Sequence, residues 1–252
     1  MSLAHIDAGH YDAVLFDLDG TLVETDNRWA KQLEDRLSWL KRLCPRADLE
    51  ELSHSVVMAI ETPGNYGIAM LERLGLAEAL NGVSDRIRQS KGLATKDGQE
   101  IVQGSVALLE ALQPRFRLAV VTTRARREAS AFIQGLGLTR FFPVVITRQD
   151  VLRMKPHPEP LLKAAALLGV SPTRCIMVGD TGTDMRSARR AGALAVGVLS
   201  GFGTKRELER GGAQIILPYA ADLAPLLCEP NSVDAASYSL ASSSSSSPTP
   251  TR

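Results

Sequence analysis

Short apolar runs recur along the chain, each about as long as one buried β-strand. Within them apolar and polar residues do not alternate, which is typical of strands that are covered on both faces. The runs predict strands at residues 12–16, 118–121, 144–146, 175–178, 195–198 and 214–217.

Between these runs, apolar residues recur every three or four positions, which is the period of an amphipathic helix. The pattern predicts helices at residues 102–112, 128–136, 160–168, 184–191, 207–210 and 221–227. Strands that alternate with helices form a parallel sheet with helices on both faces. The expected fold class is therefore α/β, with a doubly wound parallel sheet as a Rossmann-like core.

One block interrupts this alternation. Residues 26–99 keep the helical period and contain no run that predicts a strand. We therefore expect an all-helical cap there, inserted between the two parts of the core, residues 1–25 and 100–228. Residues 229–252 lose the pattern and are rich in Ser, Pro and Thr, which predicts a disordered tail.

Composition and charge exclude several classes of function. A net charge of +1 over 252 residues gives no reason to expect nucleic acid or an anionic membrane as a partner. The three cysteines, Cys44, Cys175 and Cys228, are too far apart for a disulfide framework or a metal cluster. The first residues lack a secretory signal, and no run reaches the ~18 apolar residues of a membrane span. We therefore expect a cytoplasmic protein.

The stretch after the first predicted strand carries the strongest chemical signal. Asp17 and Asp19 are two residues apart, so their side chains share a face as the strand opens into a loop. Two carboxylates this close repel each other unless a cation, hydrogen bonds or a shared proton holds them, and Mg²⁺ is a common cation in such sites. One carboxylate then acts as nucleophile while the other moves protons. The alternative is a plain turn, because Asp-Gly after a strand is also a turn signal.

Other predicted strands end in polar groups that suit the same task. Thr122 and Asp180 each follow a strand, Asp184 comes four residues later, and Lys155 precedes the helix that leads into the strand before Asp180. Ligands bind at the carboxyl ends of strands in an open α/β sheet, so these groups predict one site for a metal and a phosphate. Taken singly, Thr122 or Asp180 is a helix cap, and Lys155 or Asp184 is a solvated charge.

Together these residues resemble the haloacid dehalogenase superfamily, in its phosphatase branch. The matching motifs are Asp17-Leu18-Asp19-Gly20-Thr21, Val120-Val121-Thr122, Lys155-Pro156-His157-Pro158-Glu159-Pro160 and Val178-Gly179-Asp180-Thr181-Gly182-Thr183-Asp184. They stand in the family's order, and the predicted helical block lies where this branch carries its cap.

The resemblance implies a Mg²⁺-dependent phosphatase that works through an aspartyl-phosphate intermediate. It implies that Asp17 attacks phosphorus, while Asp19 protonates the leaving alcohol and then activates water. It also implies that Mg²⁺ lies against Asp17, the backbone carbonyl of Asp19 and Asp180, with Asp184 as a further ligand or as support. The phosphate is implied to contact Leu18, Asp19, Thr122, Thr123 and Lys155.

Several positions distinguish between branches of this superfamily. Asp19 argues for phosphate chemistry, because the dehalogenases lack this second aspartate. Gly179 stands where related sugar-phosphate mutases carry an acidic residue, which favours a plain phosphatase. Thr123 and Arg124 stand where the family often has Asn. Arg124 is either a phosphate or substrate contact, or a surface arginine at a helix start.

We expect a phosphoglycolate phosphatase-like enzyme that acts on a small phosphorylated metabolite as a monomer or a homodimer. The alternatives are a nucleotidase or sugar-phosphate phosphatase of the same superfamily and, from another class, a non-catalytic protein that binds phosphorylated ligands. Specificity is expected in the cap, whose closure excludes water. There Arg28, Lys31, Asn65 and Tyr66 are either substrate contacts or ordinary polar surface.

Overall fold

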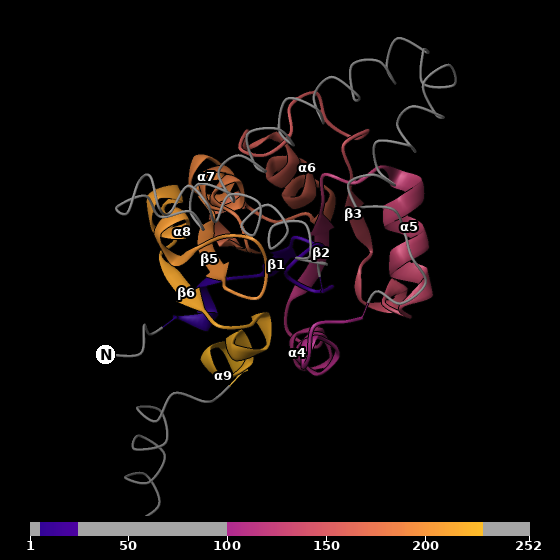
Figure 1. Ribbon diagram of the computed structural model, residues 1–252, viewed down its shortest axis with the longest axis horizontal. Helices are drawn as coiled ribbons and strands as arrows, with labels where there is room; N and C mark the ends of the chain where they lie inside the picture. Colours follow the sequence, from indigo (N-terminus) through magenta and orange to yellow (C-terminus); the bar gives the residue numbers. More distant parts are fainter. Residues whose placement is uncertain (1–5, 25–99, 229–252) are drawn as a thin grey trace, which may run out of the picture.

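Six parallel strands form one sheet at the centre of the computed structural model, which describes residues 6–24 and 100–228 (Figure 1). The strands are β1 (Ala13–Phe16), β2 (Arg117–Val121), β3 (Val144–Ile146), β4 (Cys175–Gly179), β5 (Leu194–Val198) and β6 (Ile215–Leu217). Their order across the sheet is β3-β2-β1-β4-β5-β6, and every neighbouring pair is parallel. The predicted doubly wound, Rossmann-like sheet is confirmed.

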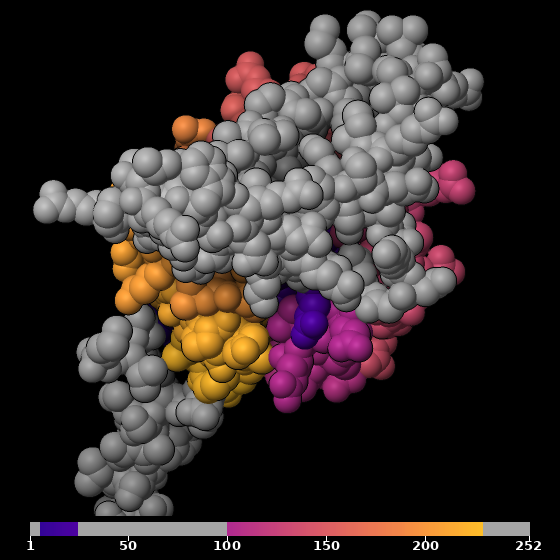
Figure 2. Space-filling view, in the orientation of Figure 1, coloured from indigo at the N-terminus to yellow at the C-terminus, as the bar shows by residue number. Residues whose placement is uncertain are grey.

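Helices cover both faces of this sheet. One face carries α4 (Ser105–Leu112), α5 (Arg126–Gly135) and α9 (Leu223–Cys228), and the other carries α6 (Glu159–Leu168), α7 (Gly182–Ala191) and α8 (Lys205–Gly211). Short 3₁₀ turns lie at Ala8–His10, Thr139–Phe141, Pro172–Arg174 and Ala220–Asp222. On the molecular surface, the gold atoms of α9 adjoin the magenta atoms of α4 (Figure 2).

Alternate side chains of a strand enter different halves of the core. In β1, Val14 and Phe16 pack with α4, α5 and α9, while Ala13 and Leu15 pack with α6, α7 and α8. All four side chains are fully buried. Burial on both faces is the physical reason that the strands are continuous apolar runs in the sequence.

Helix caps account for three of the predicted helix starts that were wrong by two or three residues. Helix α4 begins at Ser105 because Gly104 before it has a φ of 82°, in the left-handed region that ends regular helical backbone. Helices α7 and α8 begin earlier than predicted because Thr181 and Thr204 form capping boxes with the third residue of each helix.

The chain leaves and re-enters the core at one place. The N–H of Glu24 donates to the carbonyl of Glu100, and the N–H of Val102 donates to the carbonyl of Leu22. Residues 24 and 100 are thus held side by side at the edge of the core. A segment inserted between them is compatible with an undisturbed sheet. The predicted cap at residues 26–99 and the predicted tail at 229–252 lie outside the described residues. No helix of the described ranges is long and apolar enough to cross a membrane.

Candidate active site

The loop after β1 is fixed by its apolar residues. The N–H groups of Leu22 and Val23 both donate to the carbonyl of Leu18, at 3.1 and 3.0 Å, so the chain turns back on itself. Leu18, Leu22 and Val23 are fully buried in the core half that packs on α4. This anchoring holds Asp17 and Asp19 at the carboxyl edge of the sheet.

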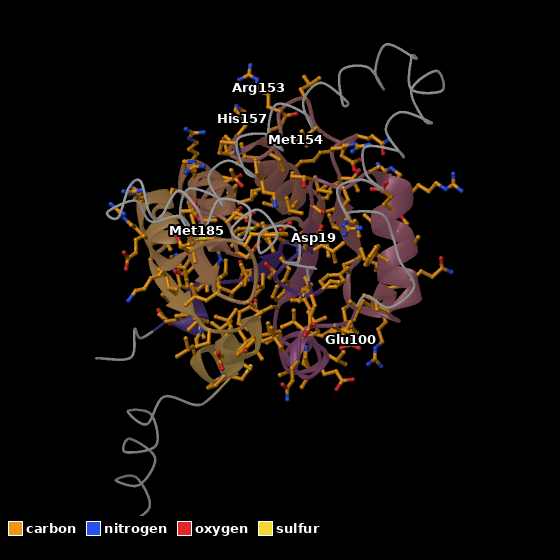
Figure 3. All side chains as sticks on the ribbon, in the orientation of Figure 1. Asp19, Glu100, Arg153, Met154, His157 and Met185 are labelled. Carbon is orange, nitrogen blue, oxygen red and sulfur yellow. The ribbon has the colours of Figure 1, made fainter. Side chains whose placement is uncertain are left out.

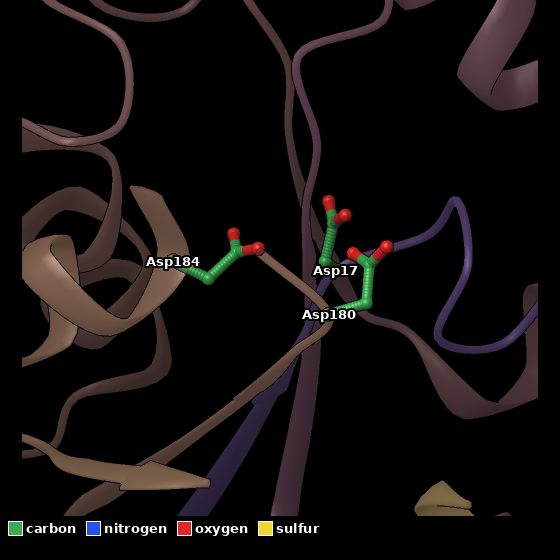
Figure 4. A group of neighbouring side chains, drawn as sticks. All are labelled: Asp17, Asp180 and Asp184. Atoms are coloured by element: carbon green, nitrogen blue, oxygen red, sulfur yellow. The ribbon is translucent and has the colours of Figure 1, made fainter. Parts of the chain in front are cut away.

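Three carboxylates meet at that edge. Asp17 follows β1, Asp180 follows β4, and Asp184 reaches toward them from the first turn of α7 (Figure 4). One oxygen from each lies within 4.8 Å of the others. Asp180 and Asp184 are each 1% exposed, and Asp17 is 8% exposed. We call these three residues the acidic cluster.

A single ammonium lies inside the acidic cluster. Lys155 Nζ donates to Asp17 Oδ1 at 2.8 Å and to the carbonyl of Val121 at 2.9 Å. It also lies 2.6 Å from Asp184 Oδ1, close enough for an ion pair although the angles are not those of a hydrogen bond. One lysine faces three buried carboxylates, so the ionised cluster keeps two negative charges that no described residue neutralises.

The pKa values reflect this imbalance. Burial raises the pKa of Asp17 to about 7; Lys155 opposes the rise, and the charges of Asp184 and Asp19 add to it. Burial, reinforced by Asp17 and Asp184, raises the pKa of Asp180 well above its usual value. Burial alone lowers the pKa of Lys155, but Asp17 and Asp184 outweigh it, so that pKa is raised and the ammonium keeps its charge.

A loop that follows β5 completes the surroundings of Asp180. The N–H of Phe202 donates to Asp180 Oδ2 at 2.8 Å. A Cβ on Gly201 would lie 2.0 Å from the same oxygen, and a Cβ on Gly20 would lie 2.3 Å from it, so both positions exclude a side chain. The sequence did not reveal this contact, because a backbone N–H carries no residue signature.

Donors suited to a phosphate surround the acidic cluster. The backbone N–H groups of Leu18, Asp19 and Thr123 have no acceptor among the described residues. Thr122 is 4% exposed, and its Oγ1 accepts from the N–H of Arg124 at 3.1 Å, which leaves the hydroxyl proton available to another acceptor.

Asp19, labelled in Figure 3, follows Asp17 by two residues but has different surroundings. Both of its carboxylate oxygens accept from the guanidinium of Arg124, at 2.5 to 3.0 Å. The side chain of Arg124 is only 12% exposed. The reading of Arg124 as a surface arginine at a helix start is therefore wrong, since helix α5 begins two residues later and the side chain turns inward.

The acidic cluster has the properties of a site for a hard divalent cation. Asp180 Oδ1 is buried and has no hydrogen-bond partner in the described part of the chain. All candidate ligands are carboxylate oxygens, which Mg²⁺ and Ca²⁺ prefer. The capping box fixes Asp184: its Oδ2 accepts from the N–H of Thr181 at 3.1 Å, and its Oδ1 faces Lys155. The helix cap is Thr181, not Asp180, and Asp184 contacts Lys155 in addition to its part in the capping box.

Gly179 gives a physical reason for one position that the sequence had singled out. A Cβ at Gly179 would lie 2.5 to 2.8 Å from the side-chain atoms of Asp184. The acidic residue that the related mutases carry at this position would displace Asp184 from its present place.

The comparisons with known proteins assign the class. Residues 14–198 match the model of the haloacid dehalogenase-like hydrolases. This match spans well over half of the chain and contains the whole acidic cluster, so the chain belongs to that family.

Individual relatives within this family are phosphatases. The chain is 26% identical to a phosphoglycolate phosphatase of Pectobacterium atrosepticum, over 84% of this chain and 90% of that relative. It is 29% identical to the pyrophosphatase PpaX of Bacillus mycoides, over 87% of this chain and 98% of that relative. The chain is accordingly an enzyme, a hydrolase of the phosphatase type.

Solved structures agree with the fold. A hydrolase from Pseudomonas syringae is 27% identical, with a TM-score of 0.56 over 84% of this chain and 95% of that one. A family hydrolase from Deinococcus radiodurans, solved with bound phosphate and sodium, is 25% identical, with a TM-score of 0.57 over 87% of this chain and 99% of that one.

Proposed function

We propose that this enzyme is a Mg²⁺-dependent phosphatase that hydrolyses a small phosphate monoester through an aspartyl-phosphate on Asp17. The observation that carries the proposal is the acidic cluster, in which three buried carboxylates share one lysine. Asp17, Asp180 and Asp184 would hold a divalent cation, which would supply the two positive charges that the cluster lacks and would stabilise the charge that spreads over the phosphoryl oxygens during transfer.

Asp17 is the nucleophile. Lys155 holds its Oδ1, which orients the carboxylate and leaves Oδ2 for attack on phosphorus. The new bond joins this oxygen to phosphorus, and the bond from phosphorus to the alcohol oxygen breaks. Asp19, two residues further on, gives its proton to that leaving oxygen. It then takes a proton from the water that attacks phosphorus and releases phosphate.

The phosphate is held by groups that are already oriented. The donors are Lys155, from the segment between β3 and α6, together with the Thr122 hydroxyl and the N–H groups of Leu18, Asp19 and Thr123, which follow β1 and β2. Fixed donors of this kind stabilise the charge on transferring oxygens without reorganisation during the reaction.

The names of the relatives support a small substrate. Phosphoglycolate and pyrophosphate each present a phosphoryl group on a small anion. Of these, a phosphoglycolate-like monoester fits the proposed role of Asp19, because an alkyl oxygen needs a proton in order to leave. The residues proposed to read the leaving group, Arg28, Lys31, Asn65 and Tyr66, lie outside the described residues.

The test is phosphate release by purified protein. Turnover of p-nitrophenyl phosphate should require Mg²⁺ and stop in excess chelator, and a panel of phosphoglycolate, pyrophosphate, nucleoside monophosphates and sugar phosphates should identify the preferred substrate. Full activity in chelator would contradict the metal role. Binding of inorganic phosphate without turnover of any ester would favour the non-catalytic alternative.

A further inference from the structure

The Asp19 carboxylate is held by one side chain of the described residues, that of Arg124. Arg124 Nε lies 3.0 Å from Oδ1 and 2.7 Å from Oδ2, and Nη2 lies 2.5 Å from Oδ1. A planar fork of two donors facing two oxygens fixes both the position and the plane of a carboxylate. Asp19 otherwise lies in a loop, and its side chain is 25% exposed.

Arg124 is itself fixed from several sides. Its guanidinium carbon lies 4.2 Å from the centre of the Phe132 ring, over its face. Phe132 belongs to α5 and is 6% exposed. The backbone of Arg124 donates to Thr122 Oγ1 and accepts from the N–H of Arg148 at 3.2 Å. Contacts with α5 and with the end of β2 thus hold Arg124 in place, and Arg124 in turn holds the side chain of Asp19 in the loop after β1.

We propose that Arg124 is the positioning residue for Asp19: it sets the orientation of the carboxylate that exchanges protons with the leaving oxygen and with water. The proposal rests on the role proposed above for Asp19. This role differs from both readings that the sequence left open, because the donors Nε and Nη2 face Asp19, not the phosphate donors beside Lys155. Proton transfer requires alignment within hydrogen-bond reach, so a loose Asp19 slows the step that needs the proton.

The leaving group distinguishes this role from substrate binding. p-Nitrophenolate leaves readily without a proton, whereas the alkyl oxygen of glycerol 2-phosphate needs one. Arg124→Met should lower kcat/KM for glycerol 2-phosphate by about 10- to 100-fold. For p-nitrophenyl phosphate, kcat/KM reports only the steps up to release of the phenolate and should fall by less than about threefold. The inhibition constant of inorganic phosphate should change by less than about twofold.

Two further variants test whether Arg124 acts through Asp19. In an Asp19→Asn background, Arg124→Met should cause little further loss, because the group that it positions is already absent. Arg124→Lys should recover only part of kcat, since an ammonium cannot hold both oxygens as a fork does. Arg126→Met is the matched control: Arg126 lies two residues away, its side chain is 60% exposed and it pairs with Asp150. It should leave both activities unchanged.

The outcomes of these experiments distinguish failure of the positioning role of Arg124 from failure of the proposed phosphatase activity. If Arg124→Met lowered the activity on both esters equally and raised the inhibition constant of phosphate, Arg124 would contact the substrate. That result would overturn the positioning role. Additive losses with Asp19→Asn would overturn it as well. A crystal structure of Arg124→Met gives a readout without turnover. The positioning role requires Asp19 to adopt new or multiple conformations there, and an unchanged Asp19 would contradict it even if the wild-type enzyme hydrolysed no ester.

Discussion

The acidic cluster and the Asp19–Arg124 pair lie at the same edge of the sheet, but their charges are balanced differently. The cluster places three buried carboxylates around one lysine. The pair matches one carboxylate with one guanidinium and retains partial exposure. A buried charge without a partner is costly, whereas a paired charge near the surface is close to neutral in energy. The cluster therefore has an excess of negative charge that a cation would balance, whereas the charges of the pair already balance each other.

Removal of Asp17, the proposed nucleophile, should have the greatest effect on activity. Asp17→Asn should lower kcat by more than about 10³-fold, because an amide does not attack phosphorus. The matched control is Asp12→Asn. Asp12 lies at the opposite end of β1, where it pairs with Arg174. Phosphate release measures both variants, and retained turnover in Asp17→Asn would remove Asp17 from its proposed role.

The next effect concerns the metal. Saturating Mg²⁺ should raise the melting temperature of the wild-type protein by several degrees, as expected when a ligand binds only the folded state at about 100 times its Kd. Asp180→Asn should abolish that response. In chelator, however, the same variant should melt above the wild type, because it removes a buried carboxylate whose Oδ1 has no hydrogen-bond partner in residues 6–24 and 100–228. If Asp180→Asn melted below the wild type in chelator and still responded to Mg²⁺, Asp180 would be neither a metal ligand nor an unbalanced buried charge.

The pH dependence of stability gives a third test. The pKa of Asp17 is raised by burial to about 7 in the folded protein, while the unfolded value is near 3.9. Between these values the folded state holds a proton that the unfolded state has lost. The stability from this group is therefore full below about pH 4 and falls as the pH rises to about 7.

The measurement is urea unfolding in chelator from pH 4 to 7, with wild type and Asp17→Asn compared. The wild type should lose up to a few kcal/mol across this window relative to the variant, in which the group does not titrate. Parallel curves for the two proteins would show that the pKa of Asp17 does not change on folding.

The smallest effect should come from a balanced pair far from the cluster. Asp12→Asn removes a partner of Arg174 where both side chains are 41% exposed. Such pairs contribute little to stability, so the melting temperature should shift by about 2 °C or less, and the response to Mg²⁺ should stay unchanged. A shift as large as that of Asp180→Asn would remove the distinction between paired and unpaired carboxylates.

Much of the site could be predicted from residues at the ends of apolar runs. Asp17, Thr122 and Asp180 follow β1, β2 and β4, and these three strands are adjacent in the sheet. Strand ends are visible in the sequence because burial on both faces requires continuous apolar residues. Their meeting point then follows from the rule that parallel strands present their carboxyl ends at one edge.

Other contacts could not be predicted because they depend on groups without a local pattern. The donation from Phe202 to Asp180 uses a backbone N–H, and the space beside Gly201 is set by how the loop after β5 folds over Asp180. The bond between Arg124 and Asp19 spans 105 positions of sequence. Nothing near Arg124 indicates which carboxylate it faces, since that depends on the order of strands and on the rotamer stacked on Phe132.

The sequence alone determined the parallel α/β fold and which residues supply the carboxylates, the hydroxyl and the ammonium of the site. It did so because strand burial and strand-end chemistry are local properties of the chain. The tertiary structure alone decided how these charges are shared. There Lys155 pairs with Asp17 and Asp184, Arg124 pairs with Asp19, and Asp180 Oδ1 has no hydrogen-bond partner among the described residues. Charge balance depends on distances and burial between segments far apart in sequence, and those exist only after the sheet has formed.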